Sequence, residues 1–311
     1  MDDYLKELTN IISNGSMENT YKMSWIRSIV ETCEKQPKKI IHFDELSPLI
    51  FKYYWNQSIF FNLQQGPNLN KKPKIQQLVE EKIKEYRTKN ETQNPITFIK
   101  VEDKVKIPVK QISTVLKQDV CKRFLILDKK VFNTYKYDLE KRTINILKPE
   151  LINEYSDILY QLINYRWTQK LEDTDGSPRI SKKVRGVDRE NTPKRKTLKP
   201  FHEFLDVENP SKRCFITGDT IPKDELSVDH VIPWSYMYSN DLWNLVYVHS
   251  SRNSSKNNRL PHEDMINRLE IRNKKLLKLL RGNSVKSKHV VELGISIEKD
   301  YVKRYWTGFK G

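Results

Sequence analysis

Two short segments decide the fold of the C-terminal half of this sequence, Leu226-Ser-Val-Asp-His-Val-Ile-Pro-Trp234 and Leu242-Trp-Asn-Leu-Val-Tyr-Val-His249. The first segment predicts a short strand that ends with an acid and a histidine side by side, Asp229 and His230. The second segment predicts another strand. We therefore expect a strand pair that carries Asp229 and His230 at one end.

The residues that follow predict a short helix behind this strand pair. Ser250 or Ser251 can cap the helix, which carries Asn253 and, one turn later, Lys256. Such a helix would bring Asn253 close to Asp229. A carboxylate and an amide carbonyl suit a hard divalent cation that keeps several waters, and magnesium is the usual case. The pattern therefore predicts a site for phosphate chemistry.

The charge of the whole chain predicts a polyanionic partner such as nucleic acid. The 311 residues include 56 Lys and Arg against 40 Asp and Glu, a formal net charge of +16. Aromatic residues make up 10% of the chain, a share that a disordered basic protein would lack. The length corresponds to about two domains. We expect a folded, basic protein of two domains.

Several features of the sequence favour a cytoplasmic protein without a membrane segment. The chain has no continuous apolar run of about 18 residues, and its acidic start differs from a secretory signal. The three cysteines, Cys33, Cys121 and Cys214, are widely spaced, which argues against a disulfide framework and favours a reducing compartment.

Residues 1–172 predict a helical N-terminal domain that binds the target or a partner. Apolar residues recur at helical spacing in the first ninety residues, and strand-like runs between 105 and 147 predict a small antiparallel sheet. An aromatic cluster favours core packing, with base stacking as the alternative; its members are Phe51, Tyr53, Tyr54 and Trp55.

Residues 173–213 predict a basic linker, because the segment is rich in Pro and Gly. The charge between Arg179 and Lys199 sums to +7. The linker is either exposed to solvent or binds along the phosphates of a nucleic acid. In the second case Lys194, Arg195 and Lys196 would contact the phosphates.

Residues 263–311 predict a basic helical C-terminal extension. Its first helix has an apolar face that includes Ile266, Leu269 and Leu276, and we expect basic residues such as Arg272 on the outer face.

The segment 214–262 resembles the HNH endonuclease family, whose ββα-metal fold carries Asp-His on the first strand, Asn before the second and Asn or His on the helix. The matching positions are Asp229-His230, Asn244 and Asn253. Their spacing is similar to that in the HNH domain of RNA-guided CRISPR nucleases. The surrounding residues are more similar to stand-alone bacterial HNH proteins with a helical N-terminal region. The resemblance implies an α+β fold, with a C-terminal ββα-metal domain after the α-rich N-terminal domain and its small antiparallel sheet.

The resemblance also implies a role for each matching residue. His230 would be the general base that takes a proton from the attacking water. Asp229 and Asn253 would hold one divalent metal, Mg²⁺ or Mn²⁺, against the scissile phosphate. Asn244 would hold the loop between the strands by hydrogen bonds and so orient His230. Phosphate contacts would come from Lys256 and Arg259.

This sequence departs from the family at the positions of a structural zinc. Relatives often carry two pairs of cysteines, and here Cys214 and Thr217 occupy the first pair, with His249 and Arg252 in the second. Cys214 and His249 leave at most two ligands where a structural zinc needs four. We therefore expect no structural zinc.

The resemblance predicts a metal-dependent endonuclease that hydrolyses phosphodiester bonds in DNA, with a role in restriction or antiphage defence. Its partners would be DNA and a second copy of the chain or a defence-system protein. Two alternatives stay open. One is a non-catalytic DNA-binding or regulatory protein that uses the ββα unit for docking, and the other is an effector subunit that a partner activates.

Overall fold

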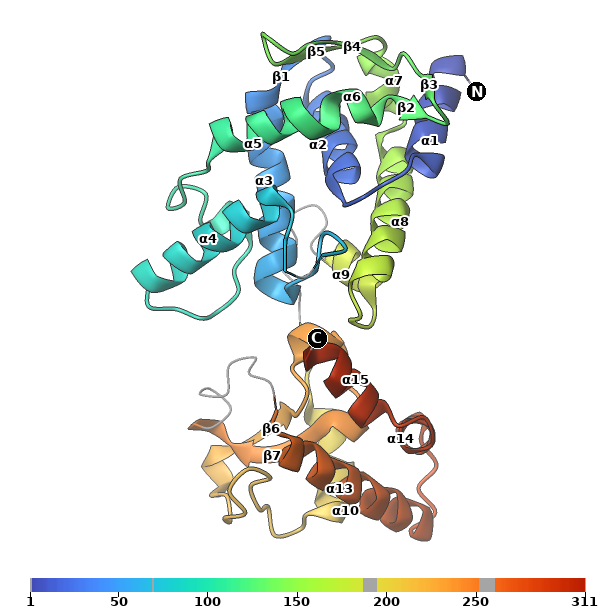
Figure 1. The fold of residues 1–311 in the computed structure, drawn as a ribbon. Coiled ribbons are helices and arrows are strands. Elements are labelled where there is room, and N and C mark those ends of the chain that lie inside the picture. Colours follow the sequence, from blue (N-terminus) through green and yellow to red (C-terminus); the bar gives the residue numbers. More distant parts are fainter. Residues whose placement is uncertain (1, 69, 187–194, 252–260, 311) are drawn as a thin grey trace. The chain divides into compact units, whose positions relative to one another are not determined.

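The computed structural model describes residues 2–68, 70–186, 195–251 and 261–310. The chain forms two compact units, shown in Figure 1. The N-terminal unit is Met1–Asp175 with Ile180–Pro193, and the C-terminal unit is Gly176–Arg179 with Lys194–Gly311. Helices and small antiparallel sheets build them, so the predicted α+β fold is confirmed. None of the described helices is long and apolar enough to cross a membrane.

Helix α2 (Tyr21–Lys35) is central to the N-terminal unit, where it packs against α3 (Phe43–Phe61) and α8 (Ser156–Thr174). Each of these three helices buries a tryptophan completely, and these are Trp25, Trp55 and Trp167. The other described helices of this unit are α1 (Asp3–Asn14), α4 (Lys74–Lys89), α5 (Val109–Val115), α6 (Cys121–Phe124), α7 (Pro149–Glu154) and α9 (Ile180–Gly186), with a π-helical turn, η2 (Leu116–Val120), and a 3-10 turn, η1 (Phe98–Lys100).

The aromatic cluster of α3 belongs to the core of this unit. Its four rings are at most 6% exposed. The Tyr53 hydroxyl donates to Glu31 of α2 over 2.6 Å, and the Tyr54 hydroxyl lies 2.7 Å from the Thr20 hydroxyl. The prediction of core packing is therefore confirmed, because buried rings with paired hydroxyls have no face for a nucleic-acid base.

The small antiparallel sheet of this unit has the order β1-β5-β4, from β1 (Ile40–His42), β5 (Thr143–Ile146) and β4 (Tyr135–Asp138). A separate two-stranded pair consists of β2 (Ile126–Leu127) and β3 (Lys130–Val131). Two features differ from the sequence prediction. Strand β1 comes from outside 105–147, and residues 109–124 are helical. Short apolar runs fit a strand and a helix equally well, so tertiary pairing decides between them.

The segment predicted as a linker contains helices. Ile180 and Val184 lie one turn apart on α9 and are buried. Further along, α10 (His202–Glu208) buries Phe204 and Leu205 in the core of the C-terminal unit. Each apolar pair is too short to produce a clear helical period in a sequence rich in Pro and Gly.

The C-terminal unit is built around the predicted strand pair, β6 (Leu226–His230) and β7 (Leu245–His249). Short helical turns connect them, α11 (Trp234–Met237) and η6 (Leu242–Asn244). The residues predicted as an extension form α13 (Glu263–Gly282), α14 (Lys288–Glu298) and α15 (Tyr301–Lys310). These helices share one hydrophobic core with the strand pair, so they are part of the same unit.

Arg272 of α13 is buried rather than on the outer face, because backbone carbonyls surround its guanidinium. It donates to the carbonyls of Leu242 and Leu245, and its Nε lies 3.5 Å from a Glu208 carboxylate oxygen. The neighbouring Asn273 amide donates to the Trp243 carbonyl over 2.8 Å. Burial lowers the pKa of Arg272 to about 10, and Glu208 opposes this shift. Helix α13 thus fixes the backbone of η6 and the start of β7.

We predict that Arg272→Leu destabilises the C-terminal unit by about 3–5 kcal/mol, because it leaves Glu208 and two carbonyls without their buried partner. Hydrogen–deuterium exchange of the peptide 242–249 measures the effect as faster exchange. Lys274→Leu, at an exposed position of the same helix, is the matched control and should leave exchange unchanged. Equal protection in both variants would contradict a structural role for the buried guanidinium.

Candidate active site

The strand register places the Asp-His pair at the end of β6. Asp229 lies opposite Val246, and His230 lies opposite Leu245. Alternation along the strand gives the two side chains different surroundings. His230 is only 5% exposed, whereas Asp229 is half-buried. The pair therefore combines an enclosed imidazole with a more accessible carboxylate.

Asn244 fixes the chain immediately after His230. Its side chain is completely buried and bonds both backbone groups of Ile232, accepting from the amide and donating to the carbonyl, each over 2.8 Å. The Asn244 carbonyl also accepts from the Val231 amide over 2.9 Å. The hydrogen bonds that the sequence predicts for Asn244 are thus present, while its part in catalysis stays a prediction.

A second amide, Asn240, orients the imidazole itself. The Nε2 atom of His230 lies 3.0 Å from Oδ1 of Asn240. The orientation of this amide is fixed, because its Nδ2 donates to the Lys196 carbonyl over 3.2 Å. An amide oxygen can only accept, so Nε2 carries the hydrogen and Nδ1 is the basic nitrogen of the neutral ring.

Arg179 holds the loop that carries Asn240. Its guanidinium donates to the Ser239 hydroxyl over 2.6 Å, to the Met237 carbonyl over 3.3 Å, and to the Asp241 carboxylate over 3.3 Å. Sequence reasoning missed Asn240 and counted Arg179 only as part of a basic segment. No motif marks either residue, because both act through contacts that the folded loop creates.

Arg195 and Lys196 of the basic segment lie beside this loop. Arg195 is exposed, and its guanidinium carbon lies 4.8 Å from the ring centre of Trp234. Partial burial lowers the pKa of Arg195, and the nearby Asp229 carboxylate opposes that shift. Lys196 is exposed and supplies the carbonyl that binds Asn240. Two predicted phosphate-binding residues thus lie close to the predicted site.

The remaining predicted site residues lie outside the described part of the chain, and they are Lys194, Asn253, Lys256 and Arg259. Ser250 and Ser251 are helical, and the rest of the predicted short helix lies outside it too. Of the two predicted metal ligands, the structure therefore describes only Asp229. Within the described residues, no three His, Cys, Asp or Glu side chains gather as a metal-binding group.

Cys214 and His249, at two of the positions where the resemblance implies zinc ligands in relatives, make hydrogen bonds here, and Arg252 lies outside the described residues. Cys214 is 2% exposed. Burial raises its pKa, but the Thr217 hydroxyl and backbone donors of Thr217, His249 and Ile216 outweigh this and hold the pKa below its ordinary value. The Nδ1 atom of His249 lies 3.1 Å from a Glu225 carboxylate oxygen. Hydrogen bonds and core packing thus hold this part of the unit.

Comparisons with known proteins bear on the same segment. Neither the curated proteins nor the solved structures give a significant match to the chain. Residues 214–262 match the model of the HNH endonuclease family. The matched segment contains β6, β7, the Asp-His pair and both orienting amides. Residues 214–262 of the C-terminal unit are therefore similar to HNH endonucleases, a family of nucleases.

Proposed function

We propose that the protein is a metal-dependent endonuclease that hydrolyses phosphodiester bonds in DNA. The observation that carries the proposal is the enclosed His230, which Asn240 holds in one orientation and which follows Asp229 directly in β6. A module that only docks onto DNA has no use for an imidazole fixed in this way. This argues against the non-catalytic alternative.

His230 serves as the general base in this proposal. Because Nε2 donates to Asn240, the proton of the attacking water passes to Nδ1. The imidazolium that forms keeps its Nε2–H bond to the Asn240 oxygen, and this bond strengthens when the ring is charged. An imidazole suits this task near neutral pH. Asn244 acts as a positioning residue, because it fixes the backbone next to His230.

The donor set fits a hard divalent cation. Asp229 offers an accessible carboxylate, and we propose Asn253 as the second oxygen ligand, with Mg²⁺ or Mn²⁺ as the metal. When bound, such an ion stabilises negative charge on the phosphate. Arg195 adds positive charge at the same place and can contact a phosphate oxygen, as we also propose for Lys194, Lys196, Lys256 and Arg259.

The substrate and the biological role rest on charge and on resemblance. The net charge of +16 supports a nucleic-acid substrate, and the family resemblance favours DNA. A role in restriction or antiphage defence, and a cytoplasmic location, follow from the resemblance to stand-alone bacterial HNH proteins and from the cysteine pattern. With one site per chain, cleavage of both strands would favour a homodimer. The N-terminal unit would bind the target or a partner protein.

One observation favours control of the site by a partner. Arg179 holds the loop of Asn240 and belongs to the four-residue segment Gly176–Arg179. This segment is part of the C-terminal unit, whereas the residues directly before and after it belong to the N-terminal unit. A partner that altered this segment would release the residue that orients His230. The effector-subunit alternative therefore stays a second candidate.

The first test is cleavage of a supercoiled plasmid by the full chain with Mg²⁺, with Mn²⁺ and with a chelator. We predict cleavage only with a metal, and a loss of about 10²–10⁴-fold in rate for His230→Ala, because the general base is removed. DNA affinity should stay within about twofold, since charge elsewhere provides the binding. His262→Ala, which changes an exposed histidine of the same unit, is the control. Undiminished cleavage by His230→Ala would refute the assignment.

Asn240→Ala should lower kcat by up to about 10²-fold with little change in KM, because the base loses its orientation while the DNA contacts stay. Asn267→Ala, at an exposed position of α13, is the matched control. Single-turnover kinetics on a labelled duplex separate the two constants. A change in KM alone would mean that Asn240 acts in binding rather than in positioning the base.

The double reversal Arg195→Glu/Lys196→Glu should weaken DNA binding and reduce its salt dependence. Each lost phosphate contact removes about 0.9 from the slope of log affinity against log salt. Lys274→Glu/Lys278→Glu changes the charge equally on the exposed face of α13 and should leave the slope near that of the wild type. Equal slopes in the two variants would show that the segment is a solvated linker.

A further inference from the structure

The N-terminal unit contains a cavity of about 960 Å³. Its walls are the start of α2, the loop between α3 and α4, the start of α4, and the segment around η2 and α6. This volume lies at the upper end of the range for small-molecule sites, which is about 300–1,000 Å³. The cavity is formed by this unit alone.

The charges of the lining are predominantly positive. Five basic and two acidic side chains line the cavity, and they are Lys22, Lys71, Lys72, Lys74, Arg123, Glu18 and Asp119. Arg123 forms ion pairs with both acidic side chains, because its Nη1 atom lies 3.9 Å from a carboxylate oxygen of Glu18 and 3.8 Å from one of Asp119. Lys72 pairs with Glu80 on α4 over 2.8 Å.

Among the described residues, Lys22, Lys71 and Lys74 of the lining form no ion pair with a carboxylate. Burial and the positive charge of Arg123 lower the pKa of Lys22, and Glu18 only partly offsets this. An anion that entered the cavity would relieve this repulsion.

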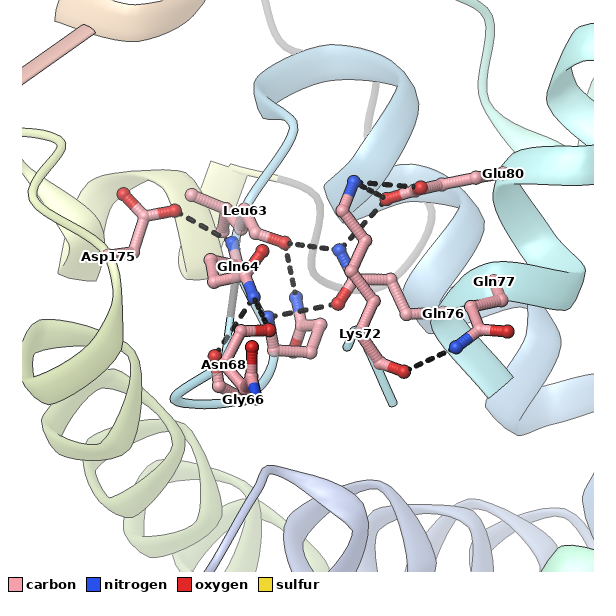
Figure 2. Close-up of polar contacts among 10 residues, drawn as sticks. Leu63, Gln64, Gly66, Asn68, Lys72, Gln76, Gln77, Glu80 and Asp175 are labelled. Carbon is pink, nitrogen blue, oxygen red and sulfur yellow. Dashed lines mark hydrogen bonds and ion pairs between the residues drawn. The ribbon is translucent and has the colours of Figure 1, made fainter. Parts of the chain in front are cut away.

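Glutamine side chains hold the loop between α3 and α4, which carries Lys71, and Figure 2 shows their hydrogen bonds. Gln64 and Gln76 are buried. The Gln64 side chain donates to the carbonyls of Gly66 and Asn68, over 3.0 and 3.3 Å. The Gln76 side chain donates to the Leu63 carbonyl over 3.3 Å, and Gln77 binds the Lys72 carbonyl over 2.6 Å. These hydrogen bonds fix the backbone of the loop at Leu63, Gly66, Asn68 and Lys72.

Two further contacts close this loop against its neighbours. The Tyr21 hydroxyl accepts from the Ile75 amide over 3.0 Å and so ties the first turn of α2 to that of α4. A Cβ at Gly66 would lie 2.8 Å from Pro73 and 3.5 Å from Asn19, so only glycine allows the loop to pack this closely. A pre-formed loop reduces the entropy that a ligand would have to overcome on binding.

The lining also offers apolar surface beside the charges. Met17, Val120 and Ile126 contribute to the walls, and Ile126 is 41% exposed. A simple inorganic anion has no use for such surface, whereas the base and sugar of a nucleotide do. Lysines bind phosphate as point charges, and the starts of two helices add partial positive charge.

We propose that this cavity binds a nucleotide through its phosphate groups, with Lys22, Lys71 and Lys74 as the phosphate contacts. The nucleotide is either a free molecule or part of a nucleic-acid strand, since both present the same phosphate, sugar and base. The proposal is independent of the C-terminal domain and holds whether or not that domain cleaves DNA.

The test measures binding of two probes to the full chain without divalent metal, so that no cleavage takes place. The probes are ATP, followed by calorimetry, and a fluorescent single-stranded 12-nucleotide DNA, followed by anisotropy. The cavity variant is Lys71→Glu/Lys74→Glu, which changes two exposed side chains. The matched control is Lys84→Glu/Lys89→Glu, with the same charge change at exposed positions of α4 outside the cavity lining.

We expect the cavity variant to bind at least one probe more than tenfold more weakly than the control. Loss of ATP binding would identify a free nucleotide as the ligand, and loss of DNA binding alone would identify a strand. The Lys22→Gln variant should also bind that probe more weakly. The thermal melting curve of this variant verifies that its N-terminal unit is folded. Equal affinities of the cavity variant and the control for both probes would overturn the proposal, whatever the plasmid assay shows.

Discussion

The buried guanidinium of Arg272 is the contact on which the C-terminal unit depends. Two strands of five residues cannot form a stable sheet alone, so β6 and β7 need a helix to cover them. Helix α13 provides apolar cover, but apolar contacts do not fix the backbone carbonyls of η6 and β7. Arg272 does so, at the cost of burying a charge beside Glu208. An ionic contact of this kind constrains geometry more than it adds stability.

That constraint reaches the backbone next to His230 through Asn244, while Asn240 holds the imidazole independently. Asn244 lies in the backbone segment that α13 holds, and its side chain fixes Ile232, two residues after the histidine. Asn240 fixes the ring from the other side of the same loop. Backbone and ring are thus fixed separately, so under the proposed mechanism the imidazole is ordered before the reaction.

The sequence predicted the secondary-structure elements that depend on neighbouring residues. The segment Leu226–His230 predicted the strand β6, and helical spacing in the first ninety residues predicted helices such as α2. It could not predict Arg272, because an amphipathic pattern assigns an arginine to the outer face unless its partners are known, and these carbonyls lie about thirty residues earlier. Asn240 and Arg179 were missed for the same reason. Strand β1 pairs with a segment a hundred residues later, and no local pattern reports such a contact.

In the N-terminal unit, the burial of the aromatic rings of α3 excludes them as a surface for nucleic-acid bases. Base stacking on the aromatic cluster of α3 would require exposed rings, but these rings are buried and the hydroxyls of Tyr53 and Tyr54 are paired. A nucleotide that binds this unit therefore cannot stack on the rings of α3. The cavity instead brings together Lys71 of the loop after α3, Lys22 of α2 and Lys74 of α4. The buried side chains of Gln64 and Gln76 hold the loop beside this cavity, and basic side chains gathered around such a loop support the nucleotide site that we propose.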